Sequence, residues 1–181
     1  MVYNINYNIA SIIFLTVFWI FLTIGYSSDS NANRCFRLLT LSVIIAAILD
    51  TVTAVTISYS TRVSVGINYV LNILFFISEA FVCSVFLAYI RFLETPDGRR
   101  RIPDLIIEIE FGIYSLMVVS SPVSHIIFYF DEAQAYTHGE AYSLVVFLPV
   151  ICMAYAVARM LAFHKRFSKK QILSVILFIV I

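Results

Sequence analysis

The chain has 181 residues, of which 61% are hydrophobic and only 13% are charged, and its formal net charge is +1. An apolar fraction so far above that of ordinary globular domains predicts an integral membrane protein, with the lipid bilayer as its surroundings. The net charge itself indicates little, because in such a chain the placement of charge matters more than its sum. We do not expect nucleic acid as a partner.

Apolar segments recur along the chain and predict an all-α, polytopic transmembrane helix bundle. The predicted spans cover residues 9–26, 38–59, 66–93, 105–121, 141–163 and 171–181. The N-terminus lacks the basic region of a cleaved signal peptide, so we expect the first span to be retained. The last segment has about eleven residues, too few to cross a bilayer. We therefore expect one transmembrane domain with five complete spans and an incomplete sixth, belonging to a longer protein.

The second and third predicted spans each carry a carboxylate far from their ends, Asp50 and Glu79. An ionisable side chain near the middle of a bilayer costs at least about 2.5 to 3.5 kcal/mol, which suggests a function. The polar residues of the third span share one face of a helix: Asn68, Asn72, Glu79 and Cys83. That face is expected to meet protein or trapped water. The predicted internal site consists of Asp50, Thr53, Asn72 and Glu79.

Patterns that indicate catalysis or metal binding do not occur in this sequence. There is no Gly-rich phosphate loop, GxSxG or HExxH, and the three cysteines are far apart, without metal-ligand spacing. Glu108 and Glu110 are two residues apart and cannot work as a pair on one helix face, so we expect them to be hydrated or paired with residues 99–101. We predict no enzymatic activity, metal or cofactor for this chain.

Basic residues gather after the first, third and fifth predicted spans: Arg34, Arg37, Arg91, Arg99, Arg100, Arg101, Arg159, Lys165, Arg166, Lys169 and Lys170. Arg62 alone falls on the other side. By the positive-inside rule, the N-terminus is outside and the basic loops face the cytoplasm. The acidic loop before the fifth span is then extracellular.

Two strings resemble parts of a known membrane module. They are NRCFRLLTLSVIIAAILD, which ends at Asp50, and HIIFYFDEAQAYTHGEAYSL, which contains Phe130, Asp131, Tyr136 and Gly139. Both are similar to the N-terminal multi-helix sensory region of bacterial GGDEF proteins, the diguanylate cyclases, and related seven-helix regions precede some histidine kinases. The resemblance implies seven helices in a bacterial cell membrane, an outside N-terminus and a cytoplasmic output domain. The chain contains no GGDEF motif, so no catalytic residue is assigned to it.

The leading functional hypothesis is a sensory membrane module. It would bind a small or membrane-soluble ligand from the outer side at Asp50, Thr53, Asn72 and Glu79, beneath a lid formed by residues 130–139, and transmit a helix displacement inward. We expect it to form a homo-oligomer. Two alternatives remain open: a small transporter or channel in which Asp50 and Glu79 line a proton or cation path, and a structural subunit whose polar faces pack against a partner.

Overall fold

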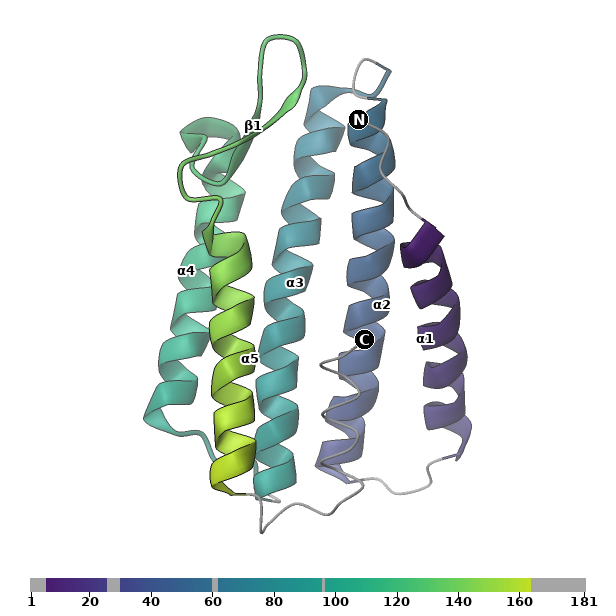
Figure 1. Ribbon diagram of the computed structural model, residues 1–181, viewed down its shortest axis with the longest axis vertical. Coiled ribbons are helices and arrows are strands. Elements are labelled where there is room, and N and C mark those ends of the chain that lie inside the picture. Colours follow the sequence, from purple (N-terminus) through teal and green to yellow (C-terminus); the bar gives the residue numbers. More distant parts are fainter. Residues whose placement is uncertain (1–5, 26–29, 60–61, 96, 164–181) are drawn as a thin grey trace.

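A computed structural model describes residues 6–25, 30–59, 62–95 and 97–163. In chain order its elements are α1 (Asn6–Gly25), α2 (Asn31–Ser58), α3 (Val65–Glu94), α4 (Ile102–Ser124), β1 (Phe128–Phe130), β2 (Tyr136–His138) and α5 (Leu144–Ala162). The helices stand side by side and each runs opposite to the one before it (Figure 1). The end of the bundle where α3 ends and α4 begins is called the arginine end, and the opposite end is called the hairpin end.

Four helices, α1, α2, α3 and α5, are long and apolar enough to cross a membrane. Helix α4 is not among them, and its first turns carry three carboxylates, Asp104, Glu108 and Glu110. Five complete spans were expected, whereas four of the five described helices have the length and composition of a span. The predicted sixth segment, residues 171–181, lies outside the described residues.

Local capping explains where the helix bounds differ from those expected. Helix α2 begins at Asn31 rather than at residue 38, because the hydroxyl of Ser30 accepts a hydrogen bond from the Asn33 N–H at 3.3 Å. Helix α4 runs through Pro122, where the sequence suggested an interruption, and ends at Ser124. His125 follows in the left-handed conformation, with φ of 56°. Pro122 cannot donate to the Val118 carbonyl one turn earlier, and the helix ends two residues later.

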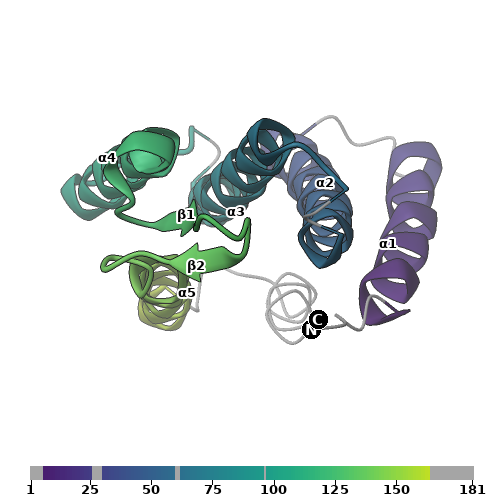
Figure 2. The same cartoon turned by 90° about the horizontal axis from the view of Figure 1, so that it is seen from above.

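Helix α3 is the centre of the packing. It contacts α2, α4 and α5, while α1 lies on the outer side of α2 (Figure 2). The expected polar face of α3 does meet protein: Asn68, Asn72 and Cys83 are buried, and Glu79 is half-buried. In contrast, many large apolar side chains point outward on α1, α2 and α4, as suits helices surrounded by lipid.

A short antiparallel hairpin interrupts the otherwise all-α fold. Strands β1 and β2 pair with Phe128 opposite His138 and Phe130 opposite Tyr136. From the sequence, a loop without strands was expected at these residues. Alternating aromatic residues on β1 supply a buried face, and Phe128 and Phe130 both pack against the ring of Tyr69 on α3. The hairpin thereby covers the ends of α3, α4 and α5 (Figure 2).

Candidate functional site

Two of the four predicted site residues, Asp50 and Glu79, line the same cavity. It has a volume of about 660 Å³ and lies between α1, α2, α3 and α5. Its lining is mostly apolar, and α5 contributes Pro149 and Met153. Polar groups are few: Asn8, Ser11, Thr40, Asp50 and Glu79. The volume falls within the range of small-molecule sites, about 300 to 1,000 Å³.

The two carboxylates differ in their partners. The side-chain amide of Asn8 donates a hydrogen bond to Asp50 at 2.6 Å and links α1 to α2. Glu79 makes no hydrogen bond with any residue that the structure describes. Asp50 is therefore held by a neighbour, whereas Glu79 keeps its hydrogen-bonding capacity for the cavity. Asn8 was not among the predicted site residues, because it lies one residue before the expected first span. A polar residue at the boundary of a span could have indicated it.

Thr53 and Asn72, the other two predicted site residues, do not line this cavity. Asn72 is buried and its amide donates to the carbonyl of Asn68, one turn earlier, at 2.8 Å. The buried hydroxyl of Thr53 and the buried amide of Asn68 have no hydrogen-bond partner among the described residues. The predicted four-residue site is thus divided into a cavity pair and two buried groups elsewhere in the α2 and α3 helices.

The predicted lid residues form the hairpin and its turn, and none of them lines the cavity. The Phe130 N–H donates to the hydroxyl of Tyr69 at 3.1 Å. The carboxylate of Asp131 accepts from the Ala135 N–H at 2.8 Å and closes the turn, and Tyr136 stacks on Phe128. A Cβ at Gly139 would lie 2.2 Å from two backbone carbonyl oxygens, so only glycine fits. These residues anchor the hairpin to the helix ends.

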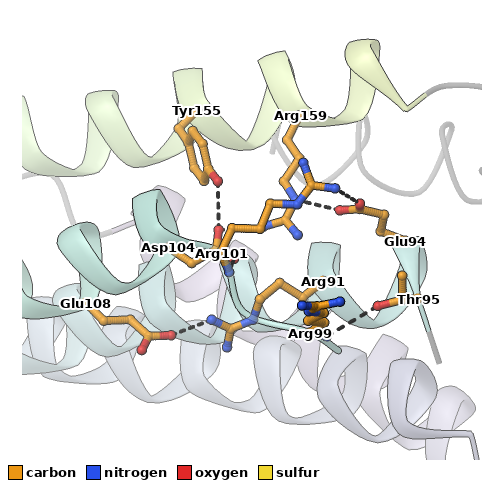
Figure 3. Close-up of polar contacts among 9 residues, drawn as sticks. All are labelled: Arg91, Glu94, Thr95, Arg99, Arg101, Asp104, Glu108, Tyr155 and Arg159. Atoms are coloured by element: carbon orange, nitrogen blue, oxygen red, sulfur yellow. Dashed lines mark hydrogen bonds and ion pairs between the residues drawn. The ribbon is translucent and has the colours of Figure 1, made fainter. Parts of the chain in front are cut away.

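An ion-pair cluster that the sequence analysis did not anticipate joins α3, α4 and α5 at the arginine end (Figure 3). Arg159 of α5 is 5% exposed; its Nε contacts Glu94 of α3 at 2.6 Å and its Nη1 contacts Asp104 of α4. The hydroxyl of Tyr155 also donates to Asp104, at 2.8 Å. Arg101 pairs with the other oxygen of Glu94. A single buried guanidinium therefore connects three helices.

A second ion pair extends the cluster along α4. Arg91 contacts Glu108 at 2.5 Å, and Arg100 approaches the other oxygen of Glu108 at 3.4 Å. Glu108 and Glu110 were expected to be hydrated or paired with residues 99–101; Glu108 pairs with Arg100, and Glu110 is exposed. The cluster was missed because its arginines were explained by topology alone. A usable signal was the presence of carboxylates among those arginines.

The environment of Asp104 at the start of α4 favours its ionised form. Burial alone would raise the pKa of this carboxyl, but hydrogen bonds from the Arg101 backbone, Arg159 and Tyr155, together with the charge of Arg159, hold the pKa below its ordinary value. Asp104 therefore stays a carboxylate near neutral pH and keeps the pair with Arg159 charged.

Within the described ranges, no group of three or more His, Cys, Asp or Glu side chains could hold a metal ion. The cysteines are free, and the buried thiol of Cys152 lies 3.6 Å from the carbonyl oxygen of Cys83, to which it donates. These two cysteines therefore serve packing between α3 and α5.

The fold and the site define an all-α helical bundle with a carboxylate-lined cavity and four helices able by length and composition to cross a membrane. Comparisons with models of known protein families, with curated proteins and with solved structures find no match.

Proposed function

We propose that this bundle is a membrane-embedded sensory module that binds a small, largely apolar ligand in the cavity between α1, α2, α3 and α5. The proposal rests on one observation: Asp50 and Glu79 both line the same mostly apolar cavity. A carboxylate without a partner in such surroundings is costly, and a ligand that carries a hydrogen-bond donor would offset that cost. The ligand that fits best is an apolar molecule with an ammonium group.

The proposed orientation places the arginine end in the cytoplasm and the N-terminus outside. The alternation of helix directions supports it, because the start of α2, the end of α3, the start of α4 and the end of α5 all lie at one end of the bundle (Figure 1). The arginines of the described chain lie at these helix ends or in the loop between α3 and α4, except for Arg62, which lies between α2 and α3 at the other end. On this orientation the hairpin is extracellular, and α4 must pass through the membrane beside the four more apolar helices, because it leads from the arginine end to the hairpin (Figure 1).

Two helices connect the cavity with the ion-pair cluster, which gives the module a route for a signal. Helix α5 meets the cavity at Met153 and the cluster at Tyr155 and Arg159. The six residues from Met153 to Arg159 rise about 9 Å along a helix. Helix α3 also contributes to both, through Glu79 and Glu94. A ligand that shifts α5 against α3 would therefore strain the contacts of Arg159.

Ligand binding is tested with a fluorescent dansyl group joined by a hexyl chain to a primary ammonium, and with a second probe that carries a hydroxyl in place of the ammonium. The purified chain in detergent should bind the ammonium probe more tightly. The variant Asp50→Asn/Glu79→Gln should lose about tenfold or more of that affinity, because hydrogen bonds to charged groups contribute about 1.5 to 3 kcal/mol each. Glu110→Gln, which removes a charge from an exposed site on α4, is the control. Equal binding by all three proteins would refute the ligand proposal.

Signalling is tested separately by a distance measurement. Spin labels at the exposed positions Leu38 on α2 and Leu161 on α5 report the spacing of the two helices at the arginine end. Addition of the ammonium probe should change that spacing in the unmodified cavity and leave it unchanged in Asp50→Asn/Glu79→Gln. A bound probe without any change in spacing would contradict a sensory role.

A transport path is the alternative that the same cavity could serve. Proteoliposomes containing the chain should be impermeable to protons and small cations if the module is a sensor. Flux that depends on Asp50 and Glu79 would replace the sensory proposal by a transporter. In line with the resemblance to sensory regions of GGDEF proteins, we further propose a cytoplasmic GGDEF or kinase domain as the output, in a bacterial cell membrane. The gene sequence downstream of Ile181 tests this directly.

A further inference from the structure

A second cavity, of about 450 Å³, lies at the arginine end between the end of α3 and the start of α4. Its lining is short and strongly basic: Glu94, Thr95, Arg99, Arg100, Arg101 and Ile102. No part of the proposed ligand site contributes to it, because the two cavities share no lining residue. Binding at this cavity can therefore be measured separately from binding at the first, although Glu94 and Arg101 also belong to the ion-pair cluster.

The one carboxylate in the lining is already neutralised from within the protein. Both oxygens of Glu94 are occupied, one by Arg101 and the other by Arg159 at 2.6 Å. Asp97, in the same loop, is exposed and does not line the cavity. Of the other two lining arginines, Arg99 has no carboxylate partner among the described residues and Arg100 shares Glu108 with Arg91, so the cavity keeps an excess of positive charge.

Two guanidinium groups are available to a ligand. The Arg99 side chain makes no hydrogen bond or ion pair with a described residue, while its backbone N–H donates to the Thr95 hydroxyl at 3.3 Å. The Arg100 side chain is 64% exposed and touches only one oxygen of Glu108, at 3.4 Å. Their planar groups can each donate two parallel hydrogen bonds to one anion.

Specific contacts hold the described residues on both sides of Arg99 and Arg100. The Gly98 N–H donates to the Thr95 carbonyl at 2.9 Å, and Gly98 adopts a φ of 57°, which favours glycine. A Cβ at this position would lie 2.5 Å from the ring of Phe92. On the other side, the guanidinium of Arg101 stacks over the ring of Phe163 at 4.2 Å. Arg99 and Arg100 thus lie between Gly98 and Arg101, which are both held by contacts with aromatic rings or the backbone.

We propose that this cavity binds a phosphate group, carried either by a phospholipid headgroup or by a soluble phosphorylated molecule. Phosphate matches the donors because its several oxygens can accept from two guanidinium groups at once. Helix α4 begins at Ile102 in the cavity wall, but the Asp104 carboxylate already accepts from the Arg101 N–H in its first turn, so the guanidinium groups supply the attraction for an anion.

The experiment compares two double variants that remove the same charge. Arg99→Gln/Arg100→Gln changes the cavity, whereas Arg34→Gln/Arg37→Gln removes two arginines from the start of α2, at the same end of the bundle. Native mass spectrometry measures how much phosphatidylglycerol the full chain retains from micelles that contain both phosphatidylglycerol and phosphatidylcholine. Calorimetry measures the binding of inorganic phosphate in neutral detergent. The cavity variant should lose at least about tenfold in affinity and the α2 variant about twofold or less.

Each outcome bears on the proposal. Selective loss of phosphatidylglycerol identifies a lipid headgroup, and selective loss of inorganic phosphate identifies a soluble ligand. Equal losses of affinity in both double variants would show only diffuse attraction between basic residues and anions, and would overturn the proposal. The absence of binding by the unmodified chain would overturn it too. Arg99→Lys/Arg100→Lys keeps the charge but not the planar fork, so it should bind with intermediate affinity. The single variant Arg99→Gln, which removes no described side-chain contact, secures the test against misfolding.

Discussion

Arg159 contacts two carboxylates, Glu94 and Asp104, on two other helices, and all three side chains are almost fully buried. Replacement by Met keeps the volume of the stem but leaves both carboxylates without their shared partner. Breaking a buried ion pair in this way costs about 3 to 5 kcal/mol. We expect Arg159→Met to lower the thermal unfolding midpoint strongly in detergent, and Arg159→Lys, which keeps the charge but loses the two-sided contact, to be intermediate. A midpoint unchanged in Arg159→Met would show that the cluster does not hold the helices together.

The lowered pKa of Asp104 predicts how stability depends on pH. A carboxyl whose pKa is lower in the folded than in the unfolded chain contributes its full stabilisation above the unfolded value, about 3.9 for Asp, and this is lost as the pH falls through the folded value. Unfolding midpoints should therefore fall from pH 5 to pH 3, roughly the range in which aspartates titrate. Asp104→Asn should start lower and fall less. Glu110→Gln, at an exposed position, should retain the slope of the unmodified chain.

Two glycines offer a matched comparison. A Cβ at Gly139 would meet the backbone oxygens of His125 and Ile126 at 2.2 Å, whereas a Cβ at Gly112, within α4, would meet nothing within 4 Å. We expect Gly139→Ala to destabilise the chain by about 1 to 3 kcal/mol through displacement of the hairpin. Gly112→Ala should stabilise it by about 0.5 to 1 kcal/mol, because alanine favours a helix interior. Thermal unfolding in detergent gives both values, and the same sign for both would contradict the close packing of the hairpin.

At the scale of elements, α1 is the helix least held by the rest of the bundle. It packs mainly on α2, where the Asn8 hydrogen bond to Asp50 and the edge contact between Phe18 and Phe36 join the two helices. Asn8→Ala should loosen α1 by about 1 kcal/mol, the usual value of a polar contact between membrane helices. Hydrogen exchange should then be several-fold faster in α1 and unchanged in α5. Ser11→Ala, which alters another polar residue of the cavity, serves as the control.

The elements also show what the sequence could and could not predict. Helix α3 was expected at residues 66–93 and lies at Val65–Glu94, because a continuous apolar run defines its own ends. The hairpin was not expected, since its strands have three residues each and depend on Tyr69, far away in the chain. Five complete spans were expected, but only four described helices have the composition of a span, because α4 has the length of one and carries carboxylates in its first turns.

The part of the candidate site that could be predicted consists of charged residues within apolar segments. Asp50 and Glu79 stand out in apolar segments, and both line the cavity. Their separation from Thr53 and Asn72 depends on how α2 and α3 rotate against each other, which helical periodicity within one segment does not fix. The contacts of Arg159 with Glu94 and Asp104 required the antiparallel order of three helices, and so only the structure brought them together.

Across the whole molecule, the cavity and the ion-pair cluster have opposite effects on the free energy of unfolding. The charged side chains of the cluster satisfy one another, and α3, α4 and α5 are joined by them. In the cavity, Glu79 has no such hydrogen-bonded partner among the described residues, while Asp50 has Asn8. A group retained for binding costs stability in the unliganded protein, whereas a group that holds helices together contributes to it.

Leucine substitutions at the two carboxylates separate these roles. Glu79→Leu removes a carboxylate from an apolar cavity and should raise the unfolding midpoint, with a gain of about 1 to 3 kcal/mol, while abolishing binding of the ammonium probe. Asp50→Leu leaves the amide of Asn8 without its acceptor and should lower the midpoint. Both midpoints come from thermal unfolding of the purified chain in the same detergent. If Glu79→Leu were destabilising to the same degree as Asp50→Leu, Glu79 would be a structural contact between helices, and the cavity would lose the group on which the proposed ligand site depends.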